Sequence, residues 1–358
     1  MRFVSSLMWG MTAYMQMKSE SFKAAAYVLF GVVTVAVMTL CVCVGSVSIP
    51  LSGIAAAVWN TVLGIPIPSE DAAQSIVVFI RLPRVICVAL VGAALSLSGG
   101  AMQGLLRNPL ADGSTLGVSS GASLGAVISI AFGITFPAFP FAGTMVMAIL
   151  FAFLSLIIIL SLARGLDFSL STNTIILIGI VFSMFANSIM SFIITLSHER
   201  VRAITFWTMG SLSGSSYQNA LLLMGALLVL GGILLGLARE LNALAIGEDN
   251  ARHVGVDVKK VKLKILITVS ALIGICVSIG GSIGFVGLIM PHMTRRAVGP
   301  NHRRLLSASM FSGAVFLMLA DLAARTLLSP LELPIGVVTS FIGAIVFVYI
   351  FYSFKKVR

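Results

Sequence analysis

Three arginines stand beside long apolar stretches and are the first candidates for binding chemistry. Arg81 and Arg84 flank the proline of "FIRLPRVICVALVGAALSLSGG", and Arg325 ends the segment "LADLAAR". A guanidinium group binds a carboxylate through paired, planar hydrogen bonds. If the three side chains converge, they would form a positive rim that receives carboxylates of a soluble partner. Cationic side chains that reach out to lipid headgroups are the alternative interpretation.

Asp321 is the main candidate for a carboxylate inside an apolar stretch. Proton-coupled carriers keep ionisable groups in their spans, where these groups relay protons. Asp321 also precedes Arg325 by four residues, a spacing that predicts an ion pair on one face of a helix. A stand-alone carrier is therefore not excluded, but the sequence lacks the further carboxylates that a carrier would need.

The chain lacks the residue patterns of nucleotide, metal or nucleophilic chemistry. It contains no G-x-x-x-x-G-K-[ST] loop, and no glycine is followed by lysine, so phosphates have no cradle of that kind. All four cysteines fall in apolar runs, and Cys41-Val42-Cys43 lacks the spacing of a zinc or redox pair. The histidines are scattered over different loops: His198, His253, His292 and His302. We therefore expect no catalytic group, metal or cofactor in this chain.

The composition predicts which elements carry these residues. Of the 358 residues, 58% are hydrophobic and 10% are charged, against about 25% charged in a soluble domain. Continuous apolar runs of about 20 residues are typical of transmembrane helices. The sequence thus predicts an all-α polytopic membrane protein with about ten transmembrane helices. Their approximate ranges are 24–44, 82–106, 115–134, 141–163, 173–196, 217–237, 263–281, 284–294, 304–322 and 333–354, the short eighth run being expected to extend back through Gly280-Gly281.

The distribution of basic residues predicts the orientation. With the N-terminus inside, 18 of the 23 lysines and arginines lie on the cytoplasmic side and 5 lie outside, including the three arginines above. Because cytoplasmic loops are enriched in lysine and arginine, both termini are expected in the cytoplasm. The net charge of +11 then requires no nucleic-acid partner. We expect residues 1–23 to be a cytoplasmic lead and residues 24–358 to be a single transmembrane domain in the cytoplasmic (inner) membrane of the cell.

Small residues recur at every fourth position in two of the predicted spans. The second span contains Gly92, Ser96, Gly100 and Gly104, and the third contains Gly117, Gly121 and Gly125. Such spacing lets helix backbones approach closely in lipid. We expect packing seams, and the lining of a pathway is the alternative for some of these positions.

The loop at about 239–262 has the charge pattern of a capped helix. A short helix is expected with Glu248 and Asp249 in its first turn, Arg252 and His253 in its last turn, and Gly255 at the C′ position. Acid at the start, base at the end and a following glycine suit the helix dipole and the C-cap. With Ala251 and Val254 on one side, this helix is expected to dock on a cytoplasmic partner. A solvated loop helix without a partner is the alternative.

Several long motifs resemble one transporter family. "RLPRVICVALVGAALSLSGGAMQGLLRNPLADGSTLGVSSGASLGA" resembles the second and third spans of the permeases of ATP-binding-cassette importers for iron chelates, haem and cobalamin. "GSIGFVGLIMPHMTRR", "LADLAAR" and "LELPIGVVTSFIGAIVF" are similar to the C-terminal half of that family. The similarity runs from about residue 80 to the C-terminus, and the first 25 residues are not covered.

The resemblance implies the partners of the chain. It implies a ten-helix subunit that pairs with a second permease subunit, identical or not, around a central path. Two ATP-binding subunits, which hold ATP and Mg²⁺, would bind below, and an external substrate-binding protein would dock above. The chain itself would be a transport subunit and not an enzyme.

The resemblance also assigns roles to residues. The arginines of the R-L-P-R and D-x-x-A-R motifs, here Arg81, Arg84 and Arg325, would meet glutamates of the binding protein. Coupling to the ATPase would fall within Leu244–Val258, at Gly247, Glu248, Ala251, Arg252 and Gly255. A cytoplasmic gate would lie at the N-P-L turn, at Asn108 and Leu110. Path-lining residues would be Trp207, Met209 and Ser211 of "FWTMGSLSG", with Ser119 and Ser120 of the Ser/Gly-rich third span.

The function expected from this resemblance is import of an iron chelate, with a ferric siderophore as the first candidate cargo. Haem or cobalamin import by the same mechanism is the alternative. A stand-alone ion- or proton-coupled carrier would give no role to a capped cytoplasmic helix. A membrane scaffold or receptor would leave the Ser/Gly-rich third span unexplained.

Overall fold

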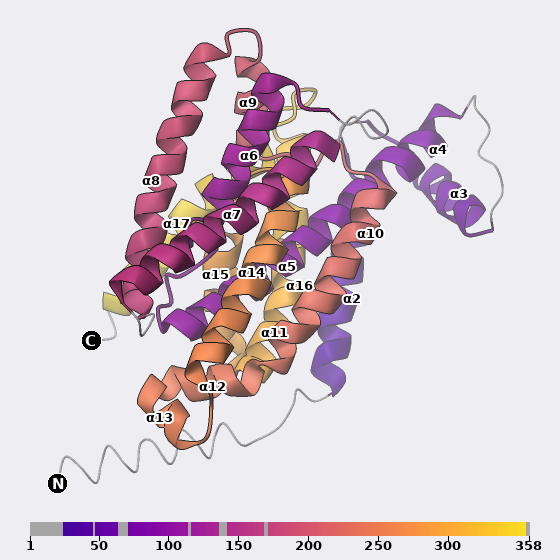
Figure 1. The fold of residues 1–358 in the computed structure, drawn as a ribbon. Coiled ribbons are helices and arrows are strands. Elements are labelled where there is room, and N and C mark those ends of the chain that lie inside the picture. Colours follow the sequence, from indigo (N-terminus) through magenta and orange to yellow (C-terminus); the bar gives the residue numbers. More distant parts are fainter. Residues whose placement is uncertain are drawn as a thin grey trace.

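The computed structural model describes residues 24–45, 47–63, 71–113, 116–135, 142–167 and 171–355, and within these ranges the chain is helical, without β-strands. The predicted lead, residues 1–23, lies outside the described residues. Figure 1 shows the helices as one bundle, with α13 at one end and α9 at the other. The first helices are α2 (Ala24–Cys43), α3 (Leu51–Val62), α4 (Ala72–Ile76), the π-helix η1 (Val77–Arg81), α5 (Leu82–Leu106), α6 (Val118–Phe132), α7 (Ala142–Leu166), α8 (Thr172–Leu196) and α9 (Val201–Thr208). The remaining ones are α10 (Tyr217–Ala226), the π-helix η3 (Leu227–Gly231), α11 (Gly232–Gly236), α12 (Ala238–Ile246), α13 (Glu248–His253), α14 (Val258–Gly280), α15 (Val286–Val298), α16 (His302–Thr326) and α17 (Ile335–Lys355).

The helices match the predicted spans closely. Among the described residues, seven helices are long and apolar enough to cross a membrane, and Val118–Phe132 and Ile335–Tyr349 are shorter apolar helices. Each of the ten predicted ranges contains a helix or a run of helices. The expected extension of the eighth range through Gly280-Gly281 is wrong, because α14 ends at Gly280 and α15 begins at Val286. Gly281 and Phe285 both have φ of 68°, and such left-handed residues cannot continue an α-helix.

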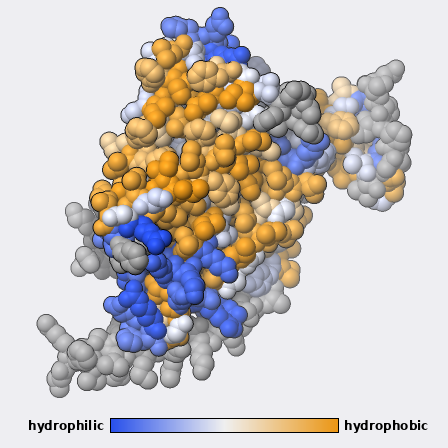
Figure 2. Space-filling view, viewed as in Figure 1, coloured by the Kyte–Doolittle hydropathy of each residue, from blue (hydrophilic) through white to orange (hydrophobic). Residues whose placement is uncertain are grey.

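The surface divides into an apolar belt and polar ends. Figure 2 shows hydrophobic side chains across the middle of one face, with hydrophilic ones gathered near α12 and α13 and again near α9. A belt of this kind is what a bilayer-spanning bundle presents to lipid tails. Which end faces the cytoplasm stays a prediction from the charge distribution.

Helix α5 forms the centre of the bundle, and its small residues allow the contact with α16. A Cβ atom added to Gly92 would lie 2.3 Å from the carbonyl oxygen of Gly313 on α16. At Gly99 it would lie 1.9 Å from the carbonyl oxygen of Gly287 on α15. On α6, a Cβ at Gly125 would lie 2.3 Å from the carbonyl oxygen of Met147 on α7. The predicted packing seams are therefore confirmed.

Pro83 lies in the first turn of α5, and the chain is already helical before this residue, from Ala72 onward. Because proline has no N–H, it cannot donate to the carbonyl of Phe79 four residues earlier. The π-helical turn Val77–Arg81 comes directly before the proline that lacks this hydrogen bond, and the N–H of Leu82 bonds the carbonyl of Val77, five residues back. The wider turn carries the helix past the proline and places Arg81 inside the bundle.

Candidate functional site

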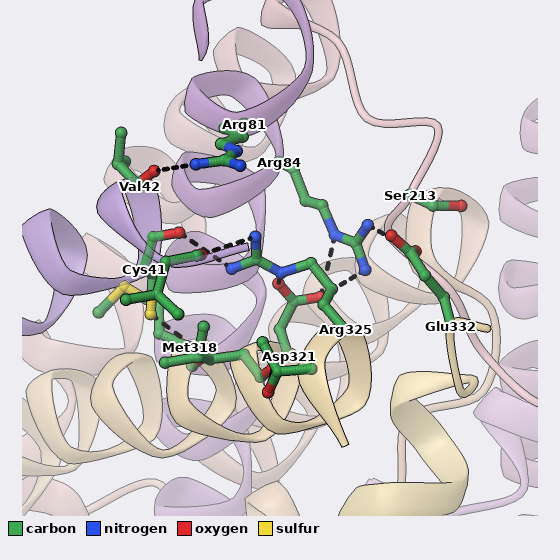
Figure 3. Close-up of polar contacts among 12 residues, drawn as sticks. Cys41, Val42, Arg81, Arg84, Ser213, Met318, Asp321, Arg325 and Glu332 are labelled. Carbon is green, nitrogen blue, oxygen red and sulfur yellow. Dashed lines mark hydrogen bonds and ion pairs between the residues drawn. The ribbon is translucent and has the colours of Figure 1, made fainter. Parts of the chain in front are cut away.

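The first candidate site is a buried ion cluster at the end of the bundle opposite α13 (Figure 3). The Arg84 Nη2 atom lies 2.9 Å from Asp321 Oδ1, and its Nε donates to the same oxygen at 3.0 Å. Arg84 Nη1 donates to Glu332 Oε2 at 2.8 Å. Arg84 is 5% exposed and Asp321 is 1% exposed, whereas the Glu332 side chain is 37% exposed. Glu332 is thus the member of this cluster that solvent reaches.

Arg325 and Arg81 bind the C-terminal end of α2 in the same region. Arg325 Nε lies 2.9 Å from Asp321 Oδ2, which confirms the ion pair predicted from the i,i+4 spacing. Arg325 Nη2 donates to the carbonyl of Cys41 at 3.0 Å. Arg81 donates to the carbonyls of Val42 and Cys43, at 2.9 and 3.2 Å, and to that of Val47. The last carbonyls of a helix lack partners within it and carry partial negative charge, so two guanidinium groups stabilise this end.

The structure therefore brings the three predicted arginines together but does not leave them exposed. Arg81, Arg84 and Arg325 are 4%, 5% and 3% exposed, and each has partners within the chain. Figure 3 shows them between the ends of α2, α5 and α16. They do not reach headgroups as separate side chains, and they do not form an open rim. A carboxylate arriving from outside would meet Arg84 only where Glu332 now binds it.

The second candidate site is the helix α13 at the opposite end. It spans Glu248–His253, its N-cap is Gly247, and Gly255 follows with a φ of 85°. The bounds and the C′ glycine are those that the charge pattern predicted. The expected docking face is different, because Ala251 is fully buried while Val254 is 68% exposed. Arg252 is exposed and pairs with Asp249 at 3.0 Å, so Val254 and this pair are among the parts that a partner can contact.

Glu248 ties α13 to two other elements. Its Oε1 lies 2.7 Å from Lys262 Nζ on α14 and 4.0 Å from Arg107 Nη2 at the end of α5. The Lys262 side chain is 4% exposed, so this is a buried charge with a partly exposed partner. Arg107 is the C-cap of α5 and has a left-handed φ of 50°. Glu248 therefore connects the loop helix to the point where α5 ends.

The predicted gate residues follow Arg107 directly. The N–H of Leu110 bonds Asn108 Oδ1 at 2.9 Å, which closes an Asx-type turn around Pro109. Asn108 is half-buried, and Leu110 is 44% exposed. The turn thus presents an apolar side chain at the α13 end of the bundle. The turn begins directly after Arg107, the arginine that faces Glu248.

Asp257 begins α14 beside this site. Its side chain accepts from the N–H of Lys260 at 3.1 Å and pairs with Lys260 Nζ at 3.0 Å. The hydrogen bond from the Lys260 side chain lowers the pKa of Asp257. The carboxylate therefore stays ionised as an N-cap, where negative charge suits the helix dipole.

Most of the predicted path-lining residues lie near the turn between α14 and α15. A small cavity of about 60 Å³ is lined by Ser119, Asp112 and the segment 281–285, whereas Ser120 is half-buried and is not part of this lining. The N–H of Ser211 bonds the carbonyl of Gly280 at 2.9 Å. A Cβ at Gly281 would lie 2.3 Å from the carbonyl of Trp207, and one at Gly336 would lie 2.3 Å from that of Met209. Ser119 and the segment 207–211 thus both lie close to this turn.

The sequence does not reveal the partners of the buried charges Arg84 and Lys262. Glu332 is 248 residues from Arg84 in the chain, and nothing local pairs them. The sequence shows only that "LELP" places one acidic residue in the loop between the ninth and tenth predicted spans. Lys262 looked like one of several loop lysines, yet it is buried. Among the described residues no cluster of three or more His, Cys, Asp or Glu could hold a metal ion.

These features define a class: a polytopic helical membrane protein with a buried ion cluster at one end and a charged loop helix at the other. The chain belongs to the FecCD transport family, whose model matches residues 32–353. It is the permease subunit of an ABC importer of that family.

Relatives of known name support this assignment. The chain is 42% identical to the uncharacterized ABC transporter permease protein YvrB of Bacillus subtilis (strain 168), over 94% of this chain and 96% of that protein. It is 39% identical to the cobalamin import system permease protein BtuC of Halobacterium salinarum, covering 78% and 74%. It is 37% identical to the hemin transport system permease protein HmuU of Yersinia pestis, covering 84% and 88%.

A solved structure has the same fold. It is described as a metal-chelate type ABC transporter in an inward-facing conformation, and the TM-score is 0.81 at 31% identity. The match covers 92% of this chain and the whole of the solved one.

Proposed function

We propose that this chain is the permease of an ATP-driven, binding-protein-dependent importer for an iron chelate, with a ferric siderophore as the first candidate cargo. Membership of the FecCD family and the likeness to a transporter described as metal-chelate type support this choice. Haem and cobalamin are the second candidates, because relatives carry those names.

The proposed assembly contains a second permease subunit, two ATP-binding subunits and an external binding protein, in the cytoplasmic (inner) membrane. The ATP-binding subunits hold ATP and Mg²⁺ and hydrolyse the nucleotide. The permease supplies the path, and no nucleic acid takes part.

One observation carries the coupling mechanism: Glu248 of α13 contacts both Lys262 and Arg107. A partner that grips the exposed face of α13 and moves it would pull on Glu248. The ion pair with buried Lys262 transmits that pull to the start of α14. The contact with Arg107 transmits it to the turn with Asn108 and Leu110, which would open or close the path.

Docking of the binding protein is proposed at the other end. The outer charge is Glu332, and Arg84 lies behind it. A carboxylate of the binding protein would replace Glu332 on Arg84, while Asp321 would continue to hold the guanidinium from within. Arg81 and Arg325 would fix the end of α2 during this exchange.

The test is affinity purification of the full chain from native membranes in mild detergent, with identification of what accompanies it. We expect an ATPase in about equal amount, and ATP hydrolysis that a binding protein stimulates. The ligand carried by that binding protein would name the cargo, and a corrinoid or haem there would replace the siderophore. A chain that comes out alone would contradict the importer.

A further inference from the structure

Helix α3 has one apolar face that the bundle does not cover. Leu51, Trp59 and Leu63 are 71%, 65% and 55% exposed, and Val58 is 38% exposed. Leu51, Val58 and Trp59 recur at the spacing of one helix face, and Leu63 follows at the C-cap. The opposite face is buried, with Ile54 at 6% and Ala57 at 0%.

The protein holds α3 firmly by its inner face. That face packs on α4 and η1, and Asn60 Nδ2 donates to Gln74 Oε1 on α4 at 3.2 Å. Arg81 binds the carbonyl of Val42 in the last turn of α2 and that of Val47 in the connection from α2 to α3. The inner face of α3 is therefore packed within the fold, and the outer face is the exposed one.

The position of α3 indicates what covers this face. Figure 1 shows α3 and α4 standing out from the bundle at the end opposite α13. Leu51 comes eight residues after Cys43, where the apolar helix α2 ends, so α3 begins close to the end of a candidate membrane span. Phe79 and Ile80 of η1, next to it, are 63% and 51% exposed. Exposed apolar side chains are thus present on α3 and on the helical turn that packs against it.

We propose that α3 lies in the membrane interface, with Leu51, Val58, Trp59 and Leu63 inserted among the lipids, so that the bilayer and not another protein covers its outer face. The helix "LSGIAAAVWNTV" has no charged residue, which removes the cost of bringing it to the acyl boundary. Tryptophan prefers the headgroup level, where its ring is in apolar surroundings and its N–H can bond water. The anchor would hold the end of α2, and with it Arg81 and Arg325, at a fixed depth.

Fluorescence quenching tests this placement in the full chain. The double variant Trp9→Phe with Trp207→Phe keeps Trp59 as the single tryptophan. This variant is placed in phosphatidylcholine nanodiscs whose lipid carries a nitroxide label, either near the headgroup or near the chain end. We expect the headgroup label to remove about half of the Trp59 emission and the chain-end label to remove much less. A chain without native tryptophans that carries Leu51→Trp probes the other end of α3. Residues 51 and 59 are separated by about 12 Å along a helix, so equal quenching profiles mean that the helix lies flat in the interface.

Two results would overturn the proposal. Emission that neither label quenches would mean that the face stands clear of the lipid, in water or against another protein. Clearly different depths for the two probes would mean that α3 stands across the interface and does not lie in it. Neither result depends on the cargo or on ATP, so the proposed import function would be unaffected.

Discussion

At the scale of single residues, the candidate sites depend on how buried charges are paired. Arg84 and Lys262 are 5% and 3% exposed, and each has a carboxylate of which part remains accessible, Glu332 and Glu248. A buried charge is costly when its partner is lost, whereas an exposed pair contributes little. The two partly exposed glutamates are therefore the positions where a mutation or a partner protein has the greatest effect.

Replacing Glu248 is expected to damage both stability and coupling. Glu248→Gln removes the carboxylate that lies 2.7 Å from the buried Lys262 ammonium, which should cost about 2 kcal/mol. Asp249→Asn is the matched control, because Asp249 and Arg252 form an exposed pair on the same helix, and its cost should stay within about 0.5 kcal/mol. Thermal unfolding in detergent measures both.

Adding Lys262→Met separates the structural role of Glu248 from its role in coupling. The double variant Glu248→Gln with Lys262→Met removes both charges of the pair, so stability should return. Uptake per ATP hydrolysed should stay low, because the link to Arg107 is still missing. Recovery of uptake together with stability would refute transmission through Glu248. A bulky charge at Ala251 would be a poor test, since Ala251 is fully buried.

Replacing Glu332 is expected to strengthen docking of the binding protein. Glu332→Gln removes the carboxylate that competes for Arg84, so a partner carboxylate should bind several-fold more tightly at low salt. Glu199→Gln, an equal change of charge in an exposed turn at the same end, is the control and should leave affinity unchanged. A weaker or unaltered affinity in Glu332→Gln would refute the exchange at Arg84. Changing the arginines that bind Asp321 to glutamate would place a second buried carboxylate beside it. Such variants would test folding instead of docking.

At the scale of elements, the sequence predicts well those features whose residues lie close together in the chain. The helix Glu248–His253 is visible because its charges and Gly255 lie within eight residues, and the Asp321–Arg325 pair is visible because both lie on one helix. The glycine seams are visible as a four-residue spacing. The contacts Arg84–Glu332 and Arg81 to the end of α2 join residues far apart in the chain, so no spacing reveals them. Helix α3 was missed because its 12 residues are too few for a span.

The α5–α16 contact gives a prediction at this scale. Gly92→Ala would place a methyl group against the carbonyl of Gly313, and the forced separation should cost about 2 kcal/mol or more. Gly31→Ala in α2, where nothing lies within 4 Å of the added atom, should leave the stability unchanged or raise it by up to about 1 kcal/mol. The melting temperature in detergent would show the difference. Equal values for the two variants would contradict close packing at Gly92.

At the scale of the whole molecule, the two candidate sites lie at opposite ends of one bundle. Helix α5 joins them, since Arg84 is in its first turn and Arg107 is its C-cap. Its interior is almost completely buried and is packed against α14, α15 and α16. A rigid central helix of this kind allows a change at one end to be felt at the other. Asp321 forms ion pairs with two arginines, which gives this carboxylate a structural role.

Transport in proteoliposomes is the most direct test of the central claim. The complex purified with this chain is reconstituted with its binding protein and an iron-loaded siderophore, and accumulation is followed with and without ATP on the side of the ATP-binding subunits. We predict accumulation that requires ATP, that is lost in Glu248→Gln and that does not respond to an imposed pH gradient. Accumulation driven by the pH gradient without ATP, and abolished by Asp321→Asn, would contradict the importer and establish a proton-coupled carrier.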